Sequence, residues 1–233
     1  MKLAIFDVDG TLLDNVASED TCFTQALSEV MFLPTLDDDW ASYRHVSDAG
    51  IATEAYQRVF GGAPTLDLLD ATIVRFVELL THAHETEHIS QVPGAARLLT
   101  ALPQRGWAVA IATGAWHRAA AFKLLAASLP WDNVPIATAE DGPARTDIVQ
   151  RARSRAQALH HGTPFERVVS IGDGVWDIQA ARELGLPFVG VGFGARACRL
   201  RAAGASITIA DFADLASTVS ALEQAREPLS PVP

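Results

Sequence analysis

Four aspartates stand where their side chains could share a metal ion. Asp7 and Asp9 follow directly after a short apolar segment near the start of the chain. Asp173 and Asp177 follow a second such segment far along it. Carboxylates that gather in one place repel each other unless a cation lies among them, and hard oxygen donors suit Mg²⁺ best. These aspartates therefore predict a magnesium site, provided that the fold brings the two segments together.

Residues that suit an anion follow the same kind of segment. Thr113 and Gly114 end a third apolar stretch, and Gly10 follows Asp9. Glycines leave backbone amides accessible, and such amides bind anions such as phosphate. The sequence thus places phosphate-binding groups next to the predicted metal ligands.

The segments that carry these residues have the pattern of buried parallel strands. After Pro93, continuous apolar stretches alternate with stretches of helical periodicity. The expected strands are 2–6, 107–113, 135–139, 167–172, 188–191 and 207–210; the expected helices are 95–102, 116–128, 146–159, 175–184 and one from 212. This alternation predicts an α/β fold with a Rossmann-like, three-layer core. The carboxyl ends of its parallel strands meet at one edge, where such sheets bind ligands.

The stretch 15–89 differs from the rest, because its apolar residues recur at three- and four-residue spacing and no strand pattern interrupts them. It separates the first strand from the others and is therefore an insertion. The predicted organisation is a core of residues 1–14 and 90–226, an all-helical inserted domain of residues 15–89, and a disordered, proline-rich tail of residues 227–233.

Charge and composition exclude several classes of partner. The 233 residues include 18 Lys and Arg against 28 Asp and Glu, a net charge of -10, so neither nucleic acid nor an anionic membrane surface is expected. No apolar run approaches the ~20 residues that span a bilayer, and the start of the chain does not resemble a signal peptide. With only Cys22 and Cys198 there is no disulfide framework. We expect a cytoplasmic monomer or homodimer.

The motifs, in their order, resemble those of the haloacid dehalogenase superfamily. The first is Asp-Val-Asp-Gly-Thr-Leu-Leu-Asp at 7–14, the second is Thr-Gly at 113–114, and the last is Gly-Asp-Gly-Val-Trp-Asp at 172–177. The inserted helices resemble the type 1 cap of this superfamily. The resemblance spans nearly the whole chain and is to the capped phosphatases, such as phosphoglycolate phosphatase. It implies a cap that closes over a site at the edge of the sheet.

The resemblance implies a two-step phosphoryl transfer that uses Mg²⁺ and acts on a small phosphorylated metabolite, such as phosphoglycolate or a sugar phosphate. Asp7 attacks phosphorus and becomes an aspartyl-phosphate. Asp9 protonates the leaving alkoxide and then takes a proton from water. The metal is held by the Asp7 carboxylate, the Asp9 backbone carbonyl and Asp173. Asp177 either binds the ion as well or orients one of these ligands without binding it, and we favour the second role.

The second aspartate also separates reaction classes. Relatives that displace halide need no proton for a leaving alkoxide, so the acid at Asp9 favours phosphate chemistry. Thr113, Gly114 and Gly10 are then expected to bond the phosphoryl oxygens. A phosphomutase remains the alternative, because it differs only in whether water or a sugar hydroxyl accepts the phosphoryl group.

The active-site lysine of the family pattern has no direct counterpart in this chain, so another residue has to supply the positive charge. The family usually has a lysine between the Thr motif and the last Asp motif. Lys2 begins the first strand and Lys123 lies well along the helix after Thr113, so neither fits that place. Arg145 precedes a helix at the corresponding place, and a guanidinium can hold phosphate with two bonds. We expect Arg145 to take the role; the alternative is a solvated surface arginine.

The polar turn 43–50 between the inserted helices resembles the loop that faces the active site in capped relatives. Arg44, His45, Ser47 and Asp48 are therefore expected to recognise the leaving group. The alternative is that Ser47 or Asp48 only caps the helix that follows.

Two other patterns indicate rival functions. His84 to His88 reads H-E-x-x-H, which binds zinc when both imidazoles lie on one helical face. Pro93 ends the helix soon after it, and no third ligand stands at a suitable spacing, so a zinc hydrolase is disfavoured. A non-catalytic binding module on the same fold is disfavoured too, because a binder needs none of the acids that the chain retains.

Overall fold

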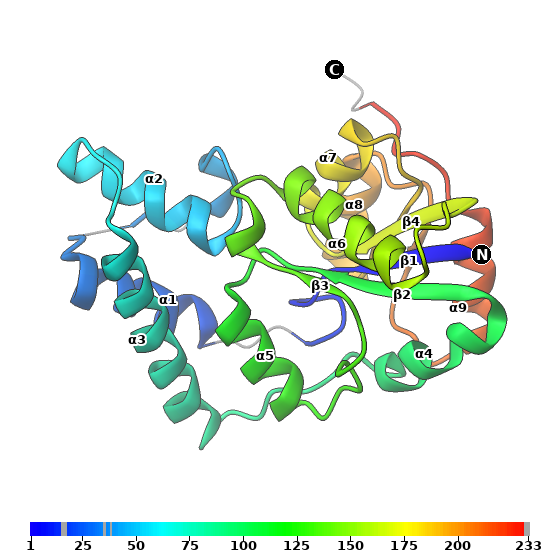
Figure 1. Cartoon of the computed structure of the whole chain (residues 1–233), viewed down its shortest axis with the longest axis horizontal. Helices are drawn as coiled ribbons and strands as arrows, with labels where there is room; N and C mark the ends of the chain where they lie inside the picture. The colour runs from blue at the N-terminus through cyan, green and yellow to red at the C-terminus, as the bar shows by residue number, and fades with distance from the viewer. Residues whose placement is uncertain (15–17, 35, 38, 231–233) are drawn as a thin grey trace.

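A computed structural model describes residues 1–14, 18–34, 36–37 and 39–230. They contain a sheet whose six strands are all parallel (Figure 1). The strands are β1 (Lys2–Phe6), β2 (Trp107–Ala112), β3 (Ile136–Ala137), β4 (Arg167–Gly172), β5 (Phe188–Val191) and β6 (Thr208–Ile209). Their order across the sheet is β3-β2-β1-β4-β5-β6. The predicted α/β, Rossmann-like fold class is confirmed.

Helices connect these strands and fill the insertion. They are α1 (Glu19–Met31), α2 (Asp48–Phe60), α3 (Leu66–His84), α4 (Ala95–Ala101), α5 (His117–Ala126), α6 (Arg145–Leu159), α7 (Val175–Glu183), α8 (Gly194–Ala202) and α9 (Leu215–Gln224). Short 3-10 turns lie at Trp40–Ser42, Pro103–Arg105 and Ala139–Asp141.

The sheet is buried on both faces, which explains its uninterrupted apolar strands. On one face Phe6 and Ile111 belong to a core that includes α4 and α9, and the ring of Phe6 packs edge-on against Phe212 with centroids 6.1 Å apart. On the other face Leu3 and Ile5 pack with α6, α7 and α8. These helices form the two outer layers.

The register of the parallel strands brings the predicted site residues to the same height along the sheet. Phe6, the last residue of β1, lies opposite Ile111 of β2 on one side and Ile171 of β4 on the other. Asp7 follows directly, while Thr113 and Asp173 each lie two residues beyond those partners. The chemistry-bearing residues of all three strands therefore emerge together at the carboxyl edge.

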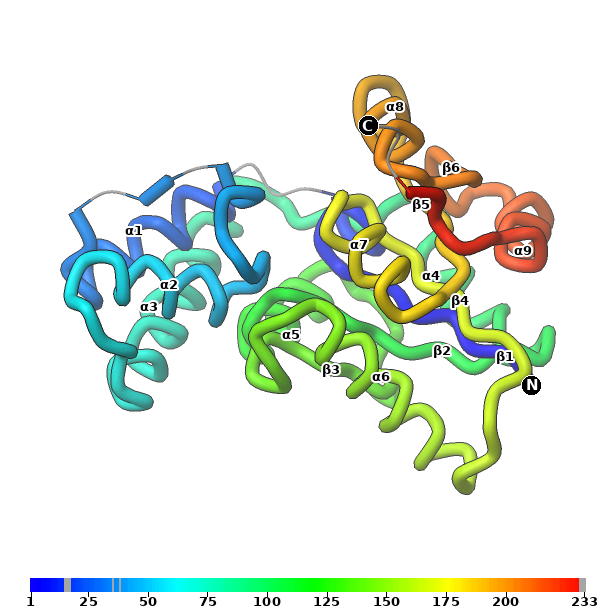
Figure 2. Tube along the Cα trace, turned by 90° about the horizontal axis from the view of Figure 1, so that it is seen from above, coloured from blue at the N-terminus to red at the C-terminus, as the bar shows by residue number. Residues whose placement is uncertain are grey.

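Helices α1, α2 and α3 pack with each other beyond this edge, at the end of the molecule opposite the N-terminus (Figures 1 and 2). Trp116, at the start of α5, joins their apolar core and is 1% exposed. Its ring centroid lies 5.6 Å from Phe23 of α1 and 6.0 Å from Phe76 of α3. The inserted helices are thus docked on the sheet domain by aromatic packing. The domain boundaries themselves stay a prediction, and residues 15–17 at the first one lie outside the described ranges.

The C-terminal segment is held as far as the structure describes it. The Leu229 N–H donates to the Gly204 carbonyl at 3.0 Å, and Arg182 Nη2 donates to the Leu229 carbonyl at 2.8 Å. The prediction of a disordered tail from residue 227 is therefore wrong for these residues, because backbone pairing fixes them. Residues 231–233 lie outside the described part. Among the described helices, none is long and apolar enough to cross a membrane.

Candidate active site

Three aspartates form a compact cluster at the carboxyl edge. One carboxylate oxygen from each of Asp7, Asp173 and Asp177 lies within 4.8 Å of the others. Asp7 is 5% exposed, and its N–H donates to the Ile171 carbonyl at 2.9 Å, which ties the end of β1 to β4. Strand register thus brings the two predicted acidic motifs together.

The cluster has the electrostatics of a cation site. Burial, and after it the charge of Asp177, raise the pKa of Asp7 well above its usual range. The same two causes, in the same order, raise the pKa of Asp173 to about 7. Like charges held this close in a buried place favour protonation unless a cation neutralises them. The donors are all carboxylate oxygens, which fits a hard ion such as Mg²⁺.

Asp177 lies inside this cluster, whereas the sequence analysis favours a role for it outside the metal ligands. Its Oδ2 accepts a hydrogen bond from the Gly174 N–H at 3.1 Å. A Cβ at Gly172 would lie 2.4 Å from the same oxygen, so only glycine lets the carboxylate come this close to the strand end. The local backbone therefore fixes the orientation of Asp177.

Arg145 contacts the cluster directly. Its Nη1 donates to Asp7 Oδ1 at 3.1 Å, and its Nε lies 3.7 Å from Asp177 Oδ1. The side chain is 13% exposed, so it is not the solvated surface arginine of the alternative interpretation. Within the described residues its buried Nε has no hydrogen-bond partner. A buried donor of this kind is suited to an anion that enters the site.

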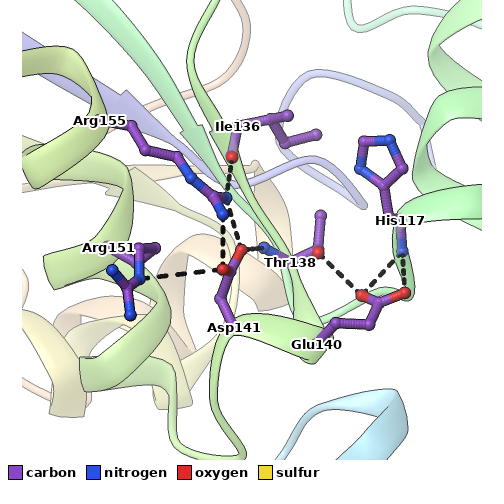
Figure 3. Close-up of polar contacts among 7 residues, drawn as sticks. All are labelled: His117, Ile136, Thr138, Glu140, Asp141, Arg151 and Arg155. Carbon is purple, nitrogen blue, oxygen red and sulfur yellow. Dashed lines mark hydrogen bonds and ion pairs between the residues drawn. The ribbon is translucent and has the colours of Figure 1, made fainter. Parts of the chain in front are cut away.

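A network of acidic side chains fixes the loop from β3 to α6 that presents this arginine (Figure 3). Asp141 accepts hydrogen bonds from both terminal nitrogens of Arg155, at 2.6 and 2.7 Å, and from the Thr138 N–H. Glu140 accepts the N–H of His117, at 2.9 and 3.0 Å, and the Thr138 hydroxyl. The loop is thereby joined to the start of α5 and to the middle of α6.

Lys123 lies in the site although sequence reasoning set it aside. Its Nζ donates to Asp9 Oδ1 at 2.5 Å and also to the Glu19 carboxylate, and the side chain is 0% exposed. The signal was available, because Lys123 follows Ala119 and Ala120 at helical spacing and so lies on the buried face of α5. A buried lysine needs acidic partners, and here they come from the first motif and from the insertion.

Glu19 is a further residue that the sequence analysis missed. It begins α1, so Lys123 joins the insertion to the sheet domain through a buried ion pair. Burial, followed by the charge of Asp9, raises the pKa of Glu19 to about 8, although the ammonium of Lys123 opposes the shift.

The four predicted residues of the turn 43–50 form two pairs, Ser47 with Asp48 and Arg44 with His45. Ser47 Oγ accepts the Gly50 N–H at 3.1 Å, so Ser47 caps α2 as the alternative interpretation proposed. Asp48 Oδ2 accepts the Trp116 N–H at 2.8 Å, and the Asp48 N–H donates to the Gly114 carbonyl at 2.8 Å. This pair fastens the insertion to the loop after β2. Burial is the largest cause that raises the pKa of Asp48 to about 7.

A cavity of about 250 Å³ lies between the carboxyl edge and the inserted helices. Its walls include Asp9, Glu19, Ser47, Asp48, Gly114, Arg145 and Asp173. The other pair of the turn, Arg44 and His45, lines a neighbouring cavity of about 270 Å³ instead. The structure therefore brings Ser47 and Asp48, but not Arg44 and His45, to the cavity that the cluster borders.

Of the predicted anion-binding residues, Gly114 lines the cavity, and Thr113 precedes it in the chain. Thr113 is buried, and its Oγ1 accepts the Ala115 N–H at 3.1 Å. At Gly114 a Cβ would lie 3.0 Å from Arg145 Cζ, so the arginine passes directly over this residue. Gly10 has a φ of +75°, which favours glycine.

A second arginine that the sequence did not reveal pairs with an aspartate of the cluster. Arg196 of α8 donates through Nη1 to the Gly10 carbonyl at 3.3 Å and lies 3.2 Å from Asp173 Oδ2. No motif marks it.

The H-E-x-x-H segment does not form the zinc-binding arrangement. Helix α3 ends at His84, so His84 and His88 are not one turn apart on a helix. His84 Nδ1 lies 3.1 Å from the Glu87 carbonyl oxygen. Across the described residues, the one group of side chains with the spacing of a metal site is the aspartate cluster.

Comparisons with known proteins agree with this geometry. The sequence model of the haloacid dehalogenase-like hydrolases matches residues 1–185. A phosphoglycolate phosphatase of Agrobacterium fabrum is 28% identical over 216 residues, which cover 91% of this chain and 90% of that protein.

Solved structures share the fold. A hydrolase from Pseudomonas syringae aligns with a TM-score of 0.70 at 24% identity, over 94% of this chain and 98% of that one. CbbY from Rhodobacter sphaeroides, solved in complex with phosphate, aligns with a TM-score of 0.64 at 23% identity, over 92% and 96%. Because the family match covers most of the chain, this protein belongs to the haloacid dehalogenase-like hydrolases.

Proposed function

We propose that the protein is a Mg²⁺-dependent phosphatase that hydrolyses a small phosphorylated metabolite through an aspartyl-phosphate on Asp7. The observation that carries this proposal is the buried cluster of Asp7, Asp173 and Asp177 with Arg145 bonded to Asp7. The name of the Agrobacterium relative and the phosphate bound by CbbY support it.

The proposed reaction has two steps, and Asp7 and Asp9 take part in both. The Asp7 carboxylate attacks phosphorus, the ester P–O bond breaks, and Asp9 gives its proton to the departing alkoxide oxygen. Water then attacks the phosphorus of the aspartyl-phosphate, Asp9 takes its proton, and phosphate and the Asp7 carboxylate are released. Asp7, the Asp9 backbone carbonyl and Asp173 would hold Mg²⁺, with Asp177 orienting these ligands, and the bound ion would supply the positive charge that lets an anionic nucleophile approach an anionic ester.

The phosphoryl group is held by groups at the carboxyl edge of the sheet. In this proposal the Thr113 hydroxyl and the Gly10 and Gly114 amides donate to its oxygens, and the Arg145 guanidinium balances their charge. Enclosure by the inserted helices keeps bulk water away from the reacting atoms.

A panel of phosphate esters tests the proposal. Phosphate release from p-nitrophenyl phosphate and from metabolite esters is expected with Mg²⁺ and is expected to stop with EDTA. Release that persists in EDTA would contradict the role of the metal. Transfer of the phosphoryl group to an added sugar phosphate, without free phosphate, would identify a phosphomutase instead.

Arg145→Ala is expected to lower kcat about 10²-fold, because the charge that screens Asp7 from the phosphate is lost. Arg145→Lys is expected to recover part of the loss, since it restores the charge but not the two-point contact. Steady-state kinetics with p-nitrophenyl phosphate measures both. Arg153→Ala, an exposed arginine of the same helix, is the matched control. Unchanged turnover in Arg145→Ala would remove Arg145 from the site.

Mg²⁺ is expected to stabilise the protein more at pH 8 than at pH 6. The pKa of Asp173 is raised from its ordinary 3.8 to about 7, so the folded metal-free protein keeps a proton that the unfolded chain releases. The stability of the metal-free protein therefore falls as the pH rises from about 4 to about 7. A bound cation replaces the proton and removes this loss.

Thermal unfolding with and without Mg²⁺ at the two pH values measures the effect. Asp173→Asn is expected to reduce the difference, and the raised pKa of Asp7 leaves the remainder. An equal gain at both pH values would show that proton release from Asp173 is not coupled to metal binding.

A further inference from the structure

The wall of the cavity that faces away from the metal cluster is acidic. Glu19 and Asp20 line it from the first turn of α1, and Asp48 lines it from the first turn of α2. All three belong to the inserted helices and line the same cavity as Asp9, the proposed proton donor to the leaving group.

No cation from the inserted helices balances these acids. Arg58 pairs with Glu54 at 2.6 Å, and Arg75 pairs with Glu29 at 2.6 Å. Arg44 lines the neighbouring cavities. The residues outside the described ranges contain neither lysine nor arginine. The leaving-group end of the cavity thus has no described basic side chain of the insertion on its walls.

The Lys123 ammonium, which lies buried behind this wall, already pairs with two acids. Lys123 donates to both Asp9 and Glu19 and is fully covered, so one positive charge serves two acids. Asp20 is exposed and Asp48 accepts only an N–H, and no described cation lies within salt-bridge distance of either. The leaving-group end is therefore rich in acids, and because burial raises the pKa of Glu19 to about 8 and that of Asp48 to about 7, a cation beside them would favour their charged forms.

Aromatic rings complete the same wall. Phe23, Trp40 and Phe76 line the cavity, and the Phe23 ring packs edge-on with each of the other two, at 5.9 and 5.5 Å. Aromatic faces next to carboxylates attract organic cations such as alkylammonium groups, and they bind a carboxylate or a second phosphate poorly.

We propose that the substrate is a small phosphate monoester of an amino alcohol, whose protonated or quaternary amine faces Glu19, Asp20 and Asp48. This inference rests on the phosphatase function proposed above and names its substrate class. It sets the chain apart from a phosphatase for phosphoglycolate, because glycolate would place a carboxylate against an acidic wall.

Three esters of matched size test the inference: phosphoethanolamine, propyl phosphate and phosphoglycolate. They present an ammonium, a methyl and a carboxylate group at similar reach. We expect kcat/KM to be highest for phosphoethanolamine, and about tenfold or more lower for each of the others, the carboxylate being the poorest. Choline phosphate and 3,3-dimethylbutyl phosphate repeat the comparison with a quaternary ammonium and its neutral isostere.

Charge reversal on the wall separates recognition from the intrinsic reactivity of the esters. Asp20→Lys is expected to lower the phosphoethanolamine to phosphoglycolate ratio of kcat/KM about tenfold. Asp67→Lys, which reverses an exposed acid in the first turn of α3 away from the cavity, is expected to leave that ratio unchanged.

The outcomes distinguish this inference from the function on which it rests. If the protein hydrolyses p-nitrophenyl phosphate but uses propyl phosphate or phosphoglycolate as well as or better than phosphoethanolamine, the proposed substrate class is wrong. The proposed phosphatase function is unaffected by that result. An unchanged ratio in Asp20→Lys also overturns it. If no ester, p-nitrophenyl phosphate included, releases phosphate with Mg²⁺, both proposals fall.

Discussion

Asp7→Asn is expected to stop turnover without unfolding the protein. An amide of the same shape cannot form the aspartyl-phosphate, and removal of a nucleophile costs at least about 10⁴-fold in kcat. The same change removes one of three buried carboxylates that repel each other, as the raised pKa of Asp7 indicates. The melting temperature of the metal-free protein should therefore stay the same or rise, while the gain on adding Mg²⁺ shrinks.

Phosphate release and thermal unfolding, measured on one preparation, test both parts of this expectation. Asp67→Asn removes an exposed acid outside the cavity and is the control. Release above about one hundredth of the wild-type rate would exclude Asp7 as the nucleophile. A large fall in melting temperature would mean that loss of activity reflects misfolding rather than lost chemistry.

Lys123→Met is expected to damage both stability and catalysis. Methionine fills similar space but leaves Asp9 and Glu19 without their shared cation. Loss of one partner from a buried ion pair costs about 3–5 kcal/mol, because the remaining charge stays uncompensated. Asp9 also loses the donor that orients it, and general acid–base catalysis is worth about 10²–10⁴-fold, so kcat should fall by about 10²-fold.

The double variant Lys123→Met with Glu19→Gln separates the two effects. Removal of the stranded charge on Glu19 should restore much of the stability but little of the turnover, because Asp9 remains unsupported. Urea unfolding and kcat, measured on the single and double variants, complete the cycle. Lys2→Met is the control, since the Lys2–Glu223 pair is partly exposed and contributes at most about 1 kcal/mol. Wild-type turnover in the double variant would rule out a positioning role for Lys123.

The sheet and the residues at its strand ends were predictable for one physical reason. Parallel strands buried on both faces are continuously apolar, so the polar residues that end them, such as Asp7 and Asp173, are conspicuous. Short edge strands carry less of this signal. β3 spans Ile136–Ala137 and β6 spans Thr208–Ile209, both shorter than the ranges predicted for them.

The rest of the site depends on how elements pack, which sequence spacing does not contain. Lys123 reaches Asp9 because α5 runs beneath the insertion, and a long side chain can bridge that gap. Arg196 arrives from α8, an element with no motif. In the turn after Tyr43, His45 and Ser47 are two residues apart yet line different cavities, since the backbone turns between them.

The bonds of Asp48 to the loop after β2 also bear on how the specificity of this enzyme can evolve. Asp48 lines the cavity and, through the Gly114 carbonyl and the Trp116 N–H, fastens the insertion to the sheet domain. A substitution there changes the cavity wall and the junction at once. Asp20 lines the same cavity, and its exposed side chain takes no part in those bonds. New substrates are therefore more accessible through changes at Asp20 than at Asp48.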